Sequence, residues 1–165
     1  MDVYSKDSTC TLSVPDYMSS TTMLNDAATL QVMALLRQEF AIVIVEDKQT
    51  ILDEYSGFKD NMGDSATPAQ LYREIQLTLM RERARFVSEP VVTPTVIDGR
   101  NADIVEVHCE VQDKGKTTNI GYVMGFVEGG TTLNMIMAWV EESSFKEKKP
   151  LLEKIVRSFT ETGAK

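Results

Sequence analysis

Cysteine, histidine and tryptophan are scarce in this chain, whose 165 residues include two, one and one of them. Two cysteines without a C-x-x-C spacing are too few to form a metal site by themselves. Both alternate with valine or leucine along expected strands, so we predict that Cys10 and Cys109 face the core as small hydrophobic side chains. A disulfide between them stays open as the alternative if their two strands are neighbours.

Long apolar runs are absent as well. No stretch approaches the roughly 20 apolar residues that cross a bilayer, and no charged and apolar leader precedes the domain. We therefore expect no membrane insertion. The compartment stays open: it is cytoplasmic if Met1 is the native start, and the cell envelope if a signal or lipoprotein peptide was removed ahead of Val3.

Basic residues are outnumbered, since 17 Lys and Arg stand against 25 Asp and Glu, for a net charge of −8. Phosphate binding needs concentrated Lys and Arg, so we expect no nucleic-acid partner. The chain is 42% hydrophobic and long enough to bury a core of its own. We predict a single domain over residues 1–165.

Sequence motifs for nucleotide binding and serine hydrolysis are missing too. The chain has no G-x-S-x-G elbow, no G-x-G-x-x-G and no Walker loop. Ser143 and Ser144 follow the most apolar strand, but we interpret them as the link to a helix. Without a catalytic constellation, we predict a protein that is not an enzyme and that carries no cofactor.

The most apolar part of the chain is residues 119–159, which we interpret as two strands and a helix. Both faces of each strand are apolar, which predicts a central position in a sheet covered on both sides. One face of the second strand holds Leu133, Met135, Met137 and Trp139, and the other holds Ile136, Ala138 and Val140. Gly129 and Gly130 predict a hairpin turn that uses positive φ.

A helix is expected next, with Pro150 in its first turn and Gly163 at its end. Its apolar stripe is Leu151, Leu152, Ile155, Val156 and Phe159. A second helix is predicted from a capping box at Thr67 and Gln70 to about Arg85. Residues 90–98 and 103–113 then form two strands joined at an Asp-Gly turn.

Two groups of residues are candidate sites. Tyr55, Phe58 and Met62 lie in a polar stretch that we interpret as a surface loop or short helix, where they either line a groove for a partner or hold the loop on the core. Glu106, His108 and Glu110 share one face of a strand. Such a row either binds a divalent metal or is a solvated face with a salt-linked histidine.

The order of expected elements and the ending of the chain resemble PsbP-like domains, in which a strand leads through an F-x-x-x-x-P link into a helix that closes on I-V-x-S-F. The residues that carry this likeness are Trp139, Phe145, Pro150, Ile155, Val156, Ser158 and Phe159. The family includes PsbP extrinsic proteins of photosystem II, Ran-binding Mog proteins, DcrB-like bacterial proteins and chaperones for secreted toxins.

The resemblance implies an α+β fold: an α/β/α sandwich around a central antiparallel sheet of six to seven strands. It places one helix between the N-terminal strands and the C-terminal meander, and one helix at the C-terminus. It also favours a strand over a helix for residues 29–37. We expect a non-catalytic module that binds a protein partner, with a metal- or small-molecule-binding domain at Glu106, His108 and Glu110 as the alternative.

Overall fold

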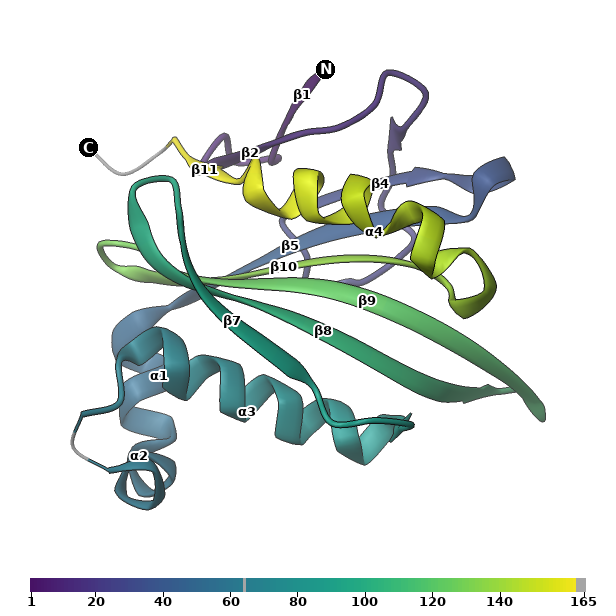
Figure 1. The fold of residues 1–165 in the computed structure, drawn as a ribbon. Coiled ribbons are helices and arrows are strands. Elements are labelled where there is room, and N and C mark those ends of the chain that lie inside the picture. The colour runs from purple at the N-terminus through teal and green to yellow at the C-terminus, as the bar shows by residue number, and fades with distance from the viewer. Residues whose placement is uncertain (64, 163–165) are drawn as a thin grey trace.

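The computed structural model describes residues 1–63 and 65–162, and within them the chain folds into a layered α+β structure (Figure 1). The predicted end of the last helix, Gly163, lies outside the described residues. The strands are β1 (Asp2–Tyr4), β2 (Cys10–Ser13), β3 (Ser19–Ser20), β4 (Leu30–Ala34), β5 (Glu39–Asp47), β6 (Arg85–Phe86), β7 (Val91–Ile97), β8 (Arg100–Asp113), β9 (Lys116–Glu128), β10 (Thr132–Glu141) and β11 (Thr160–Glu161). The helices are η1 (Leu35–Arg37), α1 (Lys48–Glu54), α2 (Ser56–Met62), α3 (Pro68–Arg83) and α4 (Glu142–Arg157).

The main sheet is antiparallel and runs in the order β3-β4-β5-β10-β9-β8-β6, with β7 also paired to β8. Over the described residues this gives eight strands, because the two-residue strands β3 and β6 add to the predicted six or seven. A separate small sheet has the order β1-β2-β11. The expected antiparallel sheet is thus confirmed. The strand predicted for residues 29–37 is confirmed over Leu30–Ala34, which pair with β5, whereas Leu35–Arg37 form the short helix η1.

Two apolar clusters lie on opposite faces of the main sheet, and they confirm that the β9–β10 hairpin is covered on both sides at the end that carries Leu133 and Met135. Ile136, Ala138 and Val140 of β10 pack beneath α4 and the small sheet. Leu133 and Met135 pack with α3 on the other face. In Figure 1, α4 lies over one side of the sheet, whereas α3 crosses beneath β8 and β9 on the other.

Two glycines of β9 allow α4 to approach the sheet closely. A Cβ at Gly121 would collide with the ring of Phe145, and one at Gly125 would lie 2.6 Å from Cγ1 of Val156. Real Cβ atoms do not come this close to other atoms, so larger residues at these positions would displace the helix. The spacing of the two glycines on one face therefore positions α4.

The start of α4 differs from the prediction. The helix begins at Glu142, and Pro150 lies inside it rather than in its first turn. Phe145 explains the difference, because this residue is buried and extends the apolar stripe toward the start of the helix. Burial of that ring outweighs the lost backbone hydrogen bond at Pro150.

The segment after β5 is also more regular than expected. The prediction of one helix before the meander is corrected, since α1 and α2 precede α3. Asp47 caps α1 by accepting a hydrogen bond from the backbone N–H of Thr50 at 2.9 Å. The capping box of α3 is confirmed, with both bonds between Thr67 and Gln70 formed.

One turn confirms its predicted geometry and another does not. Asp98 and Gly99 both have positive φ, as a tight hairpin between β7 and β8 requires. Gly129 and Gly130 do turn the β9–β10 hairpin, but neither has positive φ. Gly129 is needed for space instead, because a Cβ there would collide with Oγ1 of Thr132.

Both cysteines are buried and free, as small core side chains. Cys10 belongs to the cluster on the α4 face, whereas Cys109 shares a strand face with Val107, which packs on the α3 side. The sheet therefore separates the two thiols, and the alternative of a disulfide is wrong. Among the described residues, no helix is long and apolar enough to cross a membrane.

Candidate functional site

Tyr55, Phe58 and Met62 lie on and beside α2 and are all partly buried. Their side chains pack against the cluster that α3 forms with the sheet. The structure therefore brings the three residues together, and it favours the interpretation in which they hold this segment on the core. Their role in binding a partner stays a prediction.

His108 lies on the α4 face of β8 and is held between two carboxylates. Its Nδ1 is 2.7 Å from Oε2 of Glu142, the first residue of α4, and its Nε2 is 2.8 Å from Oε1 of Glu106. Lys149 reaches Glu106 from the next turns of α4 at 2.7 Å. The ring of Phe145 meets the imidazole edge to face at 4.6 Å. These hydrogen bonds and ion pairs hold the start of α4 against β8.

Glu110, the third residue of the predicted metal site, has another partner. Its carboxylate pairs with the Arg85 guanidinium through contacts of 2.7 and 2.9 Å. Within residues 1–63 and 65–162, no group of three or more His, Cys, Asp or Glu side chains is arranged to hold a metal ion. The structure thus brings Glu106 and His108 together and leaves Glu110 apart, and the metal site stays a prediction.

The charges around His108 set its protonation. Partial burial lowers the pKa of the imidazole, but the hydrogen bonds to Glu142 and Glu106 outweigh burial and raise the pKa above the ordinary 6.5. Burial alone would raise the pKa of Glu106, but Lys149 and His108 outweigh it and hold the pKa below the ordinary 4.5. The two carboxylates thus favour the cationic imidazole over the neutral one.

We predict that replacing His108 by Gln has a pH-dependent effect on stability. Because the folded-state pKa is raised, the imidazolium stabilises the fold fully below pH 6.5 and loses this effect as pH rises through the raised pKa. The variant should lose about 1 kcal/mol near pH 6 and almost nothing well above that pKa. Urea unfolding of both proteins across this range checks it, and a loss that does not change with pH contradicts it.

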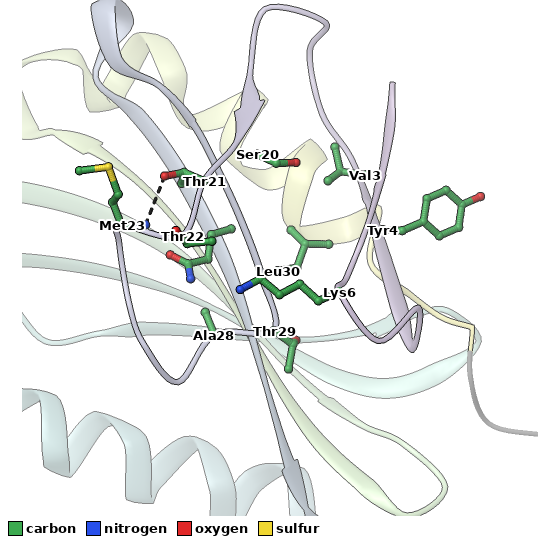
Figure 2. Close-up of a pocket in the computed structure, with 11 residues that line it drawn as sticks. Val3, Tyr4, Lys6, Ser20, Thr21, Thr22, Met23, Ala28, Thr29 and Leu30 are labelled. Carbon is green, nitrogen blue, oxygen red and sulfur yellow. Dashed lines mark hydrogen bonds between the residues drawn. The ribbon is translucent and has the colours of Figure 1, made fainter.

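A shallow cavity of about 410 Å³ opens between the small sheet and the edge of β4. Figure 2 shows Lys6 reaching across it beside Leu30, with Thr21, Thr22 and Thr29 around it, whereas the ring of Tyr4 points away. The lining mixes hydroxyls, one cation and small apolar patches. No group of reactive side chains converges among its described residues, so the cavity has no arrangement suited to catalysis.

A row of large apolar side chains crosses four adjacent strands on the α3 face. The cross-strand register aligns Met33 of β4 with Phe40 of β5, Phe40 with Trp139 of β10, and Trp139 with Tyr122 of β9. The rings of Phe40 and Trp139 stack at 5.5 Å, and those of Trp139 and Tyr122 lie 5.7 Å apart. All four side chains stay partly exposed, because α3 packs mainly against β8, β9 and β10.

A groove continues this row toward α3. It holds a volume of about 210 Å³ between the end of α3 and the loop that carries Asn25. Methionine dominates the lining, which consists of Asn25, Ile44, Gln76, Leu79, Met80, Arg83, Met124, Met135 and Met137. Met137 and Trp139 are neighbours on one face of β10, so the groove and the row form a continuous surface.

The other end of the row reaches the tip between β4 and β5. Leu35 and Leu36 of η1 are 65% and 101% exposed there, and the Arg37 guanidinium lies 4.1 Å from the centroid of the Tyr17 ring. A completely exposed leucine side chain buries no apolar surface when its own chain folds, so it adds no hydrophobic stabilisation to the fold. We call the row, the groove and this tip together the open face.

Sequence reasoning did not find the open face. The sequence predicts a covered face for Met137 and Trp139, whereas the structure fully buries only Leu133 and Met135 of that face and packs Met137 partly buried against the α3-side cluster. One signal was present: the adjacent residues Leu35 and Leu36 precede a turn, where an apolar pair has no core to enter.

Comparison with known proteins supports the fold. No protein-family profile and no curated protein sequence matches this chain. Among solved structures it is similar to cyanobacterial PsbP (CyanoP) from Synechocystis sp. PCC 6803, with a TM-score of 0.62, 12% identity and coverage of 98% of this chain and 92% of that one. It is also similar to the Saccharomyces cerevisiae Ran-binding protein Mog1p, with a TM-score of 0.57, 14% identity and coverage of 97% and 94%.

A third similar structure is LpqN of Mycobacterium tuberculosis, described as involved in cell envelope biogenesis, with a TM-score of 0.51, 11% identity and coverage of 98% and 90%. These identities show a shared fold and do not transfer a function. The chain therefore has the PsbP/Mog-like α/β/α fold, as its sequence predicted. One of these structures is, by its own description, a protein-binding protein.

Proposed function

We propose that this protein is a non-catalytic binding or accessory module that holds a protein partner on its open face. The observation that carries the proposal is the unequal cover of the main sheet. On the α4 side, helix α4 and the small sheet together bury the strands from β4 to β8. On the α3 side, the row from Met33 to Trp139 has no layer over it, although its side chains are among the largest apolar ones of the chain.

Exposed apolar surface of this kind costs free energy in water and is typical of an interface. Aromatic side chains and methionine are also the residues enriched in interface cores. A binding role agrees with the absence of a catalytic motif from the sequence, and the Ran-binding protein among the similar structures offers a precedent on the same fold.

We expect Leu36→Glu to abolish capture of the partner without affecting the fold. The side chain is fully exposed, so a charge there disturbs only a surface that a partner covers. The measurement is a native pull-down from the source organism, with quantitative comparison of the bound proteins. The matched control is Val96→Glu on β7, where an equally apolar and 62% exposed side chain lies far along the sheet from the open face.

The wild type and Val96→Glu should retain the same partner, and Leu36→Glu should lose at least about 90% of it, as expected for a charge buried in an interface. A partner retained equally by all three proteins refutes the proposal that this face is the binding surface.

A further inference from the structure

We propose that the groove beside α3 binds a soft monovalent metal ion, Cu(I), through the thioether sulfurs of its methionines. This site goes beyond the proposed capture of a partner and does not depend on it. It follows from three observations: the convergence of four methionines, the types of ligand that line the groove, and the burial of the methionine side chains.

Four of the nine methionines of the chain meet in this one groove. Met124 of β9 and Met137 of β10 are direct cross-strand partners, so their side chains leave the sheet side by side on the α3 face. Met135 lies two residues before Met137 and therefore points to the same side of β10. Met80 joins the group from α3, which packs against both strands. Three elements thus bring together thioethers that are distant in the sequence.

The types of ligand in the groove favour a soft ion. Thioethers are ligands of Cu(I), whereas Ca²⁺ and Mg²⁺ prefer oxygen ligands, and Zn²⁺ prefers thiolates, imidazoles and carboxylates. No carboxylate, imidazole or thiol is among the described residues that line the groove. Its other polar side chains are the amides of Asn25 and Gln76 and the guanidinium of Arg83. The groove therefore offers sulfur as its characteristic ligand.

The charges beside the groove are one of each sign. Arg83 lines the groove but is exposed, so its guanidinium can stay in water. Glu46 lies next to the groove, where its Oε2 is 3.4 Å from Nε2 of Gln76. Thioethers are neutral and do not compensate the charge of an ion. A monovalent ion is therefore bound at a lower electrostatic cost than a divalent one.

The loop that carries Asn25 forms a fixed wall of the groove. The side-chain oxygen of Gln31 accepts hydrogen bonds from the backbone N–H groups of Leu24 and Asn25 at 2.9 and 3.0 Å. The amide nitrogen of Gln31 donates to the carbonyl of Asn25 at 2.9 Å. The volume left between this loop and α3 is about 210 Å³, below the roughly 300–1,000 Å³ of pockets for drug-sized ligands. The groove is thus of a size for an ion.

Burial divides the four methionines into two pairs. Met124 and Met135 are 1% and 5% exposed, so packing holds their side chains in place. Met80 and Met137 are only partly buried, and their unbranched side chains can adjust to an ion that enters from solvent. Packing alone also places methionine at such positions. A packing role needs the volume of the side chain, however, whereas ion binding needs its sulfur, and an experiment can separate the two.

The test labels the methionine methyl groups of the whole protein with ¹³C and follows their nine signals by NMR. The probes are Ag⁺, a redox-inert substitute for Cu(I), then Cu(I) itself under reducing conditions, and Zn²⁺ as the contrasting ion. We expect the signals of Met80, Met124, Met135 and Met137 to shift together up to about one equivalent of Ag⁺ or Cu(I). The other five signals should stay in place, and Zn²⁺ should shift none.

Cys10 and Cys109 are the competing soft ligands of the chain. Both are 1% exposed, and burial raises the pKa of both thiols, so they stay protonated and covered. An ion held by these thiols would leave the signals of the groove methionines unchanged, and that result would overturn the inference.

The double variant Met80→Leu with Met137→Leu keeps the side-chain volume and removes two sulfurs. Its fold should be retained, and its affinity for Cu(I), measured by competition with a chromophoric chelator, should fall at least about 100-fold, since even the partners of metal ligands contribute 10–100-fold. The matched control is Met62→Leu on α2, a partly buried methionine that does not line the groove and should not affect the affinity.

Equal affinity of the double variant and the wild type, shifts confined to exposed methionines such as Met23, or no shift at all contradicts the inference. Leu36 does not line the groove, so Leu36→Glu should bind Cu(I) as the wild type does. Failure of the metal site and failure of partner capture are therefore separate results.

Discussion

Replacing Phe159 by alanine is expected to lower the free energy of unfolding by about 3–5 kcal/mol. The ring is 1% exposed and follows α4 into the cluster that this helix forms with the sheet and with β2. Its removal loses the transfer free energy of a large apolar group and leaves a cavity between two rigid layers. Such a loss is a large part of the roughly 5–15 kcal/mol that stabilises a typical domain.

Urea unfolding followed by circular dichroism measures this loss. The control is Leu36→Ala, which should change stability by less than about 0.5 kcal/mol because the leucine is completely exposed. If the two variants unfold at the same urea concentration, Phe159 does not join the C-terminal segment to the core.

Replacing Gly121 by valine should be the second most damaging change. The new side chain would occupy the space of the Phe145 ring, and neither the central strand β9 nor the helix can move freely. Overpacking of this kind costs about 1–3 kcal/mol. Because the Phe145 ring also packs edge to face on His108, the variant should in addition disturb the link between His108 and Glu142.

Thermal unfolding checks the glycine prediction, with a decrease in Tm of about 2–4 °C for each kcal/mol in a chain of this size. Gly130→Val is the matched control: a Cβ at Gly130 meets nothing within 4 Å, and its φ is not positive. An equal decrease in Tm for both variants would mean that Gly121 is not a contact between sheet and helix.

The fold was predictable where local sequence and tertiary packing agree. The capping box at Thr67, the Asp-Gly turn at Asp98 and the alternation of apolar residues along β10 each specify their geometry within a few residues. The start of α4 was not predictable in the same way. Pro150 is a strong local signal, but burial of Phe145 against Gly121 on a distant strand decides where the helix begins.

The site depended on pairings that the sequence does not show. The two-residue spacing of Glu106 and His108 was visible, and these residues do meet. The ion pair between Arg85 and Glu110 depends on the register of β6 and β8, which the sequence does not show. The contact between Glu142 and His108 depends on the position of α4. The row from Met33 to Tyr122 likewise exists only through the alignment of four strands.

The most direct test of the open face uses collisional quenching of Trp139 emission, first in the free protein and then with the captured partner bound. We predict that the free protein is quenched appreciably, because the indole is only partly buried, and that the partner suppresses the quenching. Leu36→Glu should then show no suppression at partner concentrations that protect the wild type. If Trp139 is quenched to the same extent with and without the partner, the partner binds elsewhere and the account of the open face is wrong.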